Sequence, residues 1–165
     1  VPWLISQSVT TETIVIAIAV MGPMQVAGRV LIMLFGKNTS VAVIGVITTV
    51  MFPIAIYLLW HGNKTLSVLS FSIGIFGVAN GVTTILRGAI PAEWFAPEHY
   101  AKIAGAIAVP AITLGAVAPF ALAYVWESFG APAMLSLALA VSLISCASFI
   151  FAVYRNQVSS RRARD

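Results

Sequence analysis

The chain contains five apolar stretches that are each long enough to cross a lipid bilayer. An α-helix rises about 1.5 Å per residue, so about 20 residues cover a hydrocarbon core of about 30 Å. The sequence therefore predicts an all-α fold, a polytopic transmembrane helical bundle with five complete spans. We expect residues 1–8 to form the end of a sixth span. The five stretches are residues 13–35, 41–60, 66–86, 103–126 and 133–154.

The amino-acid composition also favours a membrane protein. Hydrophobic residues make up 60% of the 165 residues and charged residues only 8%, which is too little charge to cover a soluble globule of this size. The alternative, a soluble all-α core, conflicts with apolar runs longer than the roughly 10 to 14 residues of buried core helices. We expect residues 1–154 to form one membrane domain in a lipid bilayer, followed by a basic tail at 155–165.

Basic residues are distributed unevenly between the two ends of the predicted spans. Eight lie on one side and only Lys64 lies on the other. Because lysine and arginine remain on the cytoplasmic face, this asymmetry predicts a multi-pass protein with a cytoplasmic C-terminus. The tail lacks aromatic residues on which bases would stack, so we expect contact with anionic lipids and no nucleic acid. The eight residues are Arg29, Lys37, Arg87, Lys102, Arg155, Arg161, Arg162 and Arg164.

The third predicted span carries four polar residues at i, i+3, i+4 and i+7, which places them on one face of a helix. We call them the polar seam. Lipid would leave these groups partly unsatisfied, so we expect the seam to face protein or a water-filled path. Gly74, Gly77 and Gly81 lie in the same turns and allow another backbone to approach closely. The seam consists of Asn80, Thr83, Thr84 and Arg87.

We assign a substrate path to Asn80, Thr83, Thr84 and Gly77. Each has a structural alternative. Asn80 is equally suited to join two helices, and both threonine hydroxyls can bond to their own helix backbone. Arg87 stands at the end of the span, where it serves either as a gate or as an anchor at the inner interface.

Further candidates for a gate or a helix contact are Gln25 and Arg29, which lie one turn apart in the first span. The alternative for Arg29 is that its side chain reaches the inner headgroups. In the connection at 88–100, Glu93 is expected either to pair with Arg87 or Arg29 as an ionic latch or to remain solvated. We expect Pro91 and Pro97 to occupy first-turn positions there.

The fourth predicted span has a face of small residues interrupted by two prolines. Small faces let helices pack closely, and prolines weaken the backbone ladder. We therefore predict a hinge or a packing role for Pro110, Pro119, Gly105 and Gly115. The alternatives, bending against a neighbour and ordinary tight packing, remain open. The small residues are Ala101, Ala104, Gly105, Ala108, Ala111, Gly115 and Ala118.

Residues for catalysis or metal binding are missing from the sequence pattern. There is no metal-ligand spacing, no nucleophile beside a base and no phosphate-binding glycine loop. None of the five carboxylates lies inside a predicted span. The sequence therefore predicts no enzyme, no cofactor and no metal, and it excludes an Asp or Glu proton relay within this stretch of chain. The single Cys146 excludes an internal disulfide and is expected to be a small buried hydrophobe.

Two segments resemble a known family. The run GPMQVAGRV in the first span and GVANGVTTILRGAIPAEWF in the third are similar to the C-terminal half of bacterial major facilitator superfamily permeases. The five spans then correspond to helices eight to twelve of twelve. One departure concerns the inner-loop signature of the family, where Ile32 stands in place of a carboxylate. The spacing from there to Gly36 is also one residue longer than in the signature.

The resemblance implies a secondary transporter of the bacterial inner membrane that moves a small solute by alternating access. It further implies proton-coupled export, and a missing N-terminal half of the same polypeptide as partner. The chain begins VPWLISQSV, without an initiator Met or a basic leader region, so we expect a fragment of a longer protein. The rival hypothesis is a polytopic scaffold or assembly subunit without transport activity, which predicts a start codon just upstream of Val1.

Overall fold

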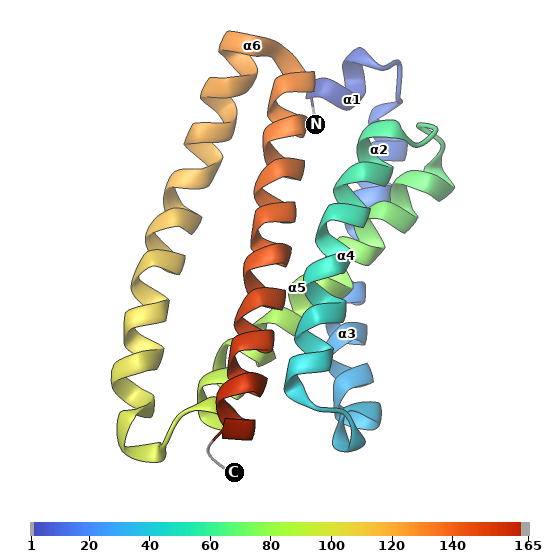
Figure 1. Ribbon diagram of the computed structural model, residues 1–165. Helices are drawn as coiled ribbons and strands as arrows, with labels where there is room; N and C mark the ends of the chain where they lie inside the picture. The colour runs from blue at the N-terminus through green and yellow to red at the C-terminus, as the bar shows by residue number, and fades with distance from the viewer. Residues whose placement is uncertain (1, 163–165) are drawn as a thin grey trace.

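The computed structural model describes residues 2–162, and Val1 and residues 163–165 lie outside the described part (Figure 1). Within the described part the chain forms helices and no strand, so the predicted all-α class is confirmed. The helices are α1 (Pro2–Ser6), α2 (Thr11–Ala19), α3 (Met21–Phe35), the short 3-10 helix η1 (Gly36–Asn38), α4 (Val41–His61), α5 (Leu66–Trp94) and α6 (Pro97–Arg162).

Local chemistry explains where several helices begin. The Thr10 and Ser40 hydroxyl oxygens accept hydrogen bonds from the backbone N–H groups of Thr13 and Val43, both at 3.3 Å, and so cap α2 and α4. Between α2 and α3, Val20 keeps helical dihedral angles. Pro23 lacks an N–H for the carbonyl of Ala19, which accounts for the interruption at this point of one long apolar segment.

The helix labelled α6 consists of two arms that run in opposite directions (Figure 1). The chain reverses at Gly130, whose φ of 82° and ψ of 175° lie outside the helical region and suit a residue without a Cβ. We call residues 97–129 the first arm and residues 131–162 the second arm. The second arm continues to Arg162, so residues 155–162 of the predicted tail extend the helix instead of following it.

Four helices within the described residues are long and apolar enough to cross a membrane. Their outer surfaces are rich in exposed large apolar side chains, such as Met33 at 75% and Phe120 at 78% exposure. Apolar exposure on this scale marks a surface that lipid or protein must cover. The four segments are Thr11–Asn38, Val41–His61, Leu66–Trp94 and Pro97–Val158, the last of which includes both arms.

Helix α5 packs against α2, α3, α4 and α6 and lies at the centre of the fold. Its contact with α3 is a close backbone approach. A Cβ added to Gly77 would lie 2.8 Å from the carbonyl oxygen of Met21, and one added to Gly81 would meet the backbone of Gln25. From the other side, a Cβ on Gly28 would lie 2.7 Å from the carbonyl oxygen of Val78. The predicted close approach along the glycines of the third span is therefore confirmed for Gly77 and Gly81.

The connection predicted at residues 88–100 is much shorter in the structure. Helix α5 continues to Trp94, and only Phe95 and Ala96 separate it from α6. Pro97 begins α6 as predicted, but the first-turn position predicted for Pro91 is wrong because this proline is buried inside α5. The helix tolerates Pro91 because burial of its ring compensates for the missing backbone hydrogen bond.

Lys64 stabilises the connection between α4 and α5. Its Nζ donates to the carbonyl oxygens of Leu59, Trp60 and Gly62, each at 2.8 Å, and lies 5.0 Å from the centre of the Trp3 ring. These carbonyls belong to the end of α4, where a cation also interacts favourably with the helix dipole. Desolvation by burial lowers the pKa of this ammonium group. The one basic residue predicted on the outer side thus has a structural role.

We expect Lys64→Met to destabilise this connection by about 1–2 kcal/mol, because three hydrogen bonds from a charged donor are lost. Amide hydrogen exchange over residues 58–65 should become faster. Lys37→Met is the matched control, since Lys37 is exposed in η1. Equal exchange rates in wild type and Lys64→Met would contradict this role.

Candidate functional site

A cleft of about 380 Å³ lies between α4, α5 and both arms of α6. We call it the α4–α5–α6 cleft. It brings together two residues of the polar seam, Thr83 and Arg87, with Thr48 and Thr49 from α4. Arg87 is the charged side chain of the cleft, and the three threonines carry its hydroxyl groups. The other lining residues are Gly45, Leu86, Ile90, Pro91, Trp94, Phe95, Ile107 and Phe149.

The three threonines of the cleft donate their hydroxyl hydrogens to their own helices. Thr48 donates to the carbonyl of Ile44 at 2.7 Å, Thr49 to that of Val46 at 3.0 Å, and Thr83 to that of Ala79 at 2.8 Å. This bonding lets a hydroxyl reside in an apolar environment. The hydroxyl oxygens keep lone pairs, so the threonines remain available as acceptors.

Prolines add further acceptors near the same cleft. Pro53 in α4 and Pro91 in α5 are buried inside their helices. Since proline has no N–H, the carbonyl oxygens four residues earlier, on Thr49 and Arg87, lack their usual helical donor. Both of these residues line the cleft.

Arg87 and an aromatic pair complete the cleft. The rings of Trp94 and Phe149 stack with their centroids 6.3 Å apart and their planes 21° apart. Gly45 makes room for this arrangement, because a Cβ there would collide with the Phe149 ring. Neither Gly45 nor Phe149 stood out in the sequence as a site residue. A lone glycine in an apolar run was the available signal, and it did not reveal the partner ring.

The predicted ionic latch is not formed in this conformation. Within residues 2–162, neither Arg87 nor Arg29 makes an ion pair with Glu93, and all three side chains are exposed. The structure thus leaves Glu93 as the solvated carboxylate that was the alternative expectation. It also leaves the guanidinium of Arg87 without an ion pair among the described residues.

The remaining members of the predicted substrate path are distributed over other surfaces of α5. Asn80 is half-buried and does not line the cleft. Thr84 is exposed and donates to the carbonyl of Gly81 at 2.6 Å. Gly77 is buried against Met21 of α3, which makes it a packing position. The cleft therefore collects only half of the polar seam.

The predicted gate residues of the first span lie on α3. Gln25 is half-buried, and its backbone packs against Gly81 of α5. Arg29 is exposed one turn further along. The contact between α3 and α5 thus involves the backbone at Gln25.

The hinge or packing residues of the fourth span all lie on the first arm. Pro110 and Pro119 are inside the helix and exposed. A Cβ added to Gly105 or Gly115 would meet nothing within 4 Å. Within residues 2–162, no neighbouring helix therefore packs closely against these two glycines.

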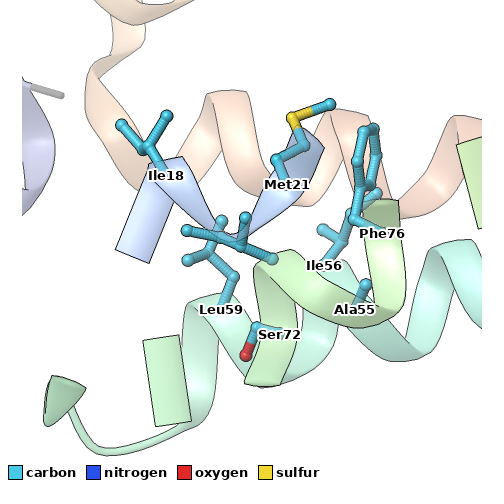
Figure 2. Close-up of a pocket in the computed structure, with 8 residues that line it drawn as sticks. Ile18, Met21, Ala55, Ile56, Leu59, Ser72 and Phe76 are labelled. Carbon is cyan, nitrogen blue, oxygen red and sulfur yellow. The ribbon is translucent and has the colours of Figure 1, made fainter. Parts of the chain in front are cut away.

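A second cavity, of about 240 Å³, lies between α2, α3, α4 and α5 (Figure 2). It is lined by apolar side chains such as Met21 and Phe76, and Ser72 is the polar residue among them. The Ser72 hydroxyl donates to the carbonyl of Val68 at 2.7 Å. Because its one polar side chain already bonds to its own helix, this cavity has few groups that could recognise a ligand. The α4–α5–α6 cleft is therefore the better candidate site.

Among the described residues, no group of three His, Cys, Asp or Glu side chains is placed to hold a metal.

Comparison with family models, with curated proteins and with solved structures finds no match to this chain.

Proposed function

We propose that the chain is part of a secondary transporter that moves a small solute across a membrane by alternating access. The observation that carries this proposal is the α4–α5–α6 cleft, which three threonines and the exposed Arg87 line between apolar helices. Polar groups at such a position are unfavourable unless they contact one another, water or a solute. Discontinuous helices with weakened backbone ladders are also characteristic of transporter binding sites, and Pro53 and Pro91 weaken the ladder beside this cleft.

The proposed topology has five spans. Segments Thr11–Asn38, Val41–His61 and Leu66–Trp94 each cross once, and the two arms of α6 cross separately because the chain reverses at Gly130. The two arms are each more than 30 residues long, which suffices for about 30 Å of hydrocarbon. By its resemblance the chain would be the C-terminal half of a major facilitator permease, with the N-terminal half as its partner.

The proposed orientation places the C-terminus in the cytoplasm of a bacterial cell, at the inner membrane. Helix η1, the α5–α6 junction and the end of α6 lie at one end of the bundle (Figure 1). Lys37 and Lys102 belong to this end, whereas Lys64 belongs to the connection at the opposite end. Retention of basic residues on the cytoplasmic side supports this orientation. Export and proton coupling are further parts of the proposal that come from the resemblance.

Flux measurements on the full-length protein test the transporter hypothesis. The purified protein is reconstituted in liposomes, a pH gradient is imposed, and flux of anionic, neutral and cationic solutes is compared with that of protein-free liposomes. We expect gradient-dependent flux of at least one class. Flux equal to the passive leak for every class would contradict the proposal.

We expect Asn80→Leu to reduce this flux. Asn80 is half-buried on the polar seam, and leucine removes an amide that can bond to water or to a partner helix without changing the side-chain size greatly. A loss of one such hydrogen bond corresponds to about 1 kcal/mol, or about a fivefold change. Asn80→Gln is the control that keeps the amide. Unchanged flux in Asn80→Leu would show that this part of the seam is structural only.

A scaffold role is the second candidate, and the exposed first arm favours it. The open space at Gly105 and Gly115 suits close packing of another helix. A transporter half would use this face against its other half, whereas a scaffold would use it against a separate protein. Cysteine cross-linking from position 105 distinguishes them, because the first predicts a link within one polypeptide and the second a link between two.

A further inference from the structure

We propose that the α4–α5–α6 cleft binds an amphiphile that combines an apolar body with a single anionic head, and that Arg87 binds the head. Such an amphiphile is the solute class that we assign to the proposed transport site. To the extent that the bound molecule is the transported one, the inference rests on the proposed function.

The walls of the cleft specify an apolar body. Leucine, isoleucine, proline and aromatic side chains form most of the lining, and the stacked rings of Trp94 and Phe149 provide a flat surface. The hydroxyl hydrogens of Thr48, Thr49 and Thr83 are already donated to their own helices. A sugar or another polyol would therefore find acceptors for its hydroxyl hydrogens but, from these threonines, no donors for its own oxygen atoms, which is costly in an apolar site.

The head must be an anion. Arg87 is the charged side chain of the cleft, it offers up to five N–H donors, and no carboxylate lines the cleft. Among the described residues it has no acidic partner, and the nearest candidate in the sequence, Glu93, is exposed and unpaired with it. A cationic head would meet Arg87 with no compensating negative charge. A carboxylate or phosphate instead forms charge-assisted hydrogen bonds with a guanidinium.

The anionic head can come from two sources. One is a free organic carboxylate, and the other is the phosphate of a membrane lipid whose acyl chain occupies the apolar cleft. Both share the chemistry proposed here, an anionic head joined to an apolar body. The experiment therefore includes an arm for each source.

The test uses the full-length protein in nanodiscs of phosphatidylcholine and calorimetric titration with three probes of similar shape, benzoate, benzamide and benzylammonium. We expect benzoate to bind about tenfold to a hundredfold more tightly than benzamide, as expected for hydrogen bonds to a charged group, and benzylammonium to bind most weakly. Arg87→Gln should abolish the preference for benzoate, and Arg87→Lys should retain most of it. Lys102→Gln, which removes an exposed cation at the same end of the bundle but outside the cleft, should behave as wild type.

A second arm uses nanodiscs that also contain phosphatidylglycerol. If this lipid suppresses benzoate binding in wild type and is retained after purification by wild type but not by Arg87→Gln, the natural head is a lipid phosphate. If it has no effect while benzoate still binds, the source is a free carboxylate. Both results support an Arg87-bound anion.

Three results would overturn the inference. They are equal affinity for benzoate and benzamide, a benzoate preference that persists in Arg87→Gln, and the absence of both benzoate binding and Arg87-dependent lipid retention. Thermal melting confirms that each variant is folded. Parallel flux measurements separate this inference from the proposed function. Arg87-dependent binding without any flux would contradict the transport proposal but not the anion site. Flux without any Arg87-dependent binding contradicts the anion site alone.

Discussion

Gly81→Ala should lower the thermal unfolding midpoint of the protein by about 5–10 °C, because overpacking of a tight contact costs about 1–3 kcal/mol. The added Cβ would meet the backbone of Gln25, with its carbonyl carbon at 2.8 Å and its Cα at 2.9 Å. Backbone atoms cannot rotate away as a flexible side chain can. Helices α3 and α5 must therefore separate, and every contact along their shared face weakens.

One opposing effect must be weighed against this clash. Alanine is favoured over glycine inside a helix by about 1 kcal/mol, so the substitution would stabilise α5 if the space were free. Gly105→Ala measures that contribution alone, because a Cβ at position 105 meets nothing within 4 Å. We expect its unfolding midpoint to equal or slightly exceed that of wild type. If Gly81→Ala also melted at or above the wild-type midpoint, α3 and α5 would not be in the close contact described here.

The helices and a close backbone approach at the glycines of α5 were predictable from the sequence because both depend on local patterns, whereas α3 as the partner was not predicted. Apolar runs of spanning length determine the helices, and glycines at Gly77 and Gly81 mark a surface that another backbone can reach. Helix termini were less predictable. Pro91 is a strong local signal for a helix start, but burial of its ring in the cleft wall keeps it inside α5.

The cleft was harder to predict than the helices. The spacing of residues along one helix identified the polar seam. It could not identify Thr48 and Thr49 as neighbours of the seam, because they lie on another helix. Which faces of α4, α5 and the second arm meet depends on the order in which helices pack, and helical periodicity carries no information on that order. Phe149 illustrates the difficulty, since it is one of many aromatic residues in apolar runs until Gly45 and Trp94 are placed beside it.

We expect Thr83→Trp to reduce solute flux at least tenfold, which corresponds to a loss of about 1.4 kcal/mol of binding. Thr83 lines the α4–α5–α6 cleft from α5, so an indole at this position would occupy part of its 380 Å³ and displace the bound solute. The hydroxyl lost by the substitution bonds only to the carbonyl of Ala79 on the same helix. Its removal should therefore have little effect on the fold, and the volume of the new side chain is the dominant change.

Thr113→Trp provides the matched control for this experiment. The Thr113 hydroxyl donates to the carbonyl of Val109 at 2.9 Å, four residues earlier, which is the same local bond as that of Thr83. Its side chain, however, is exposed on the first arm and lies outside the cleft. Wild-type flux in Thr113→Trp together with loss of flux in Thr83→Trp would locate the solute path in the cleft. Wild-type flux in both variants, with unchanged thermal melting, would mean that the solute passes elsewhere, because an occupied cleft cannot also conduct.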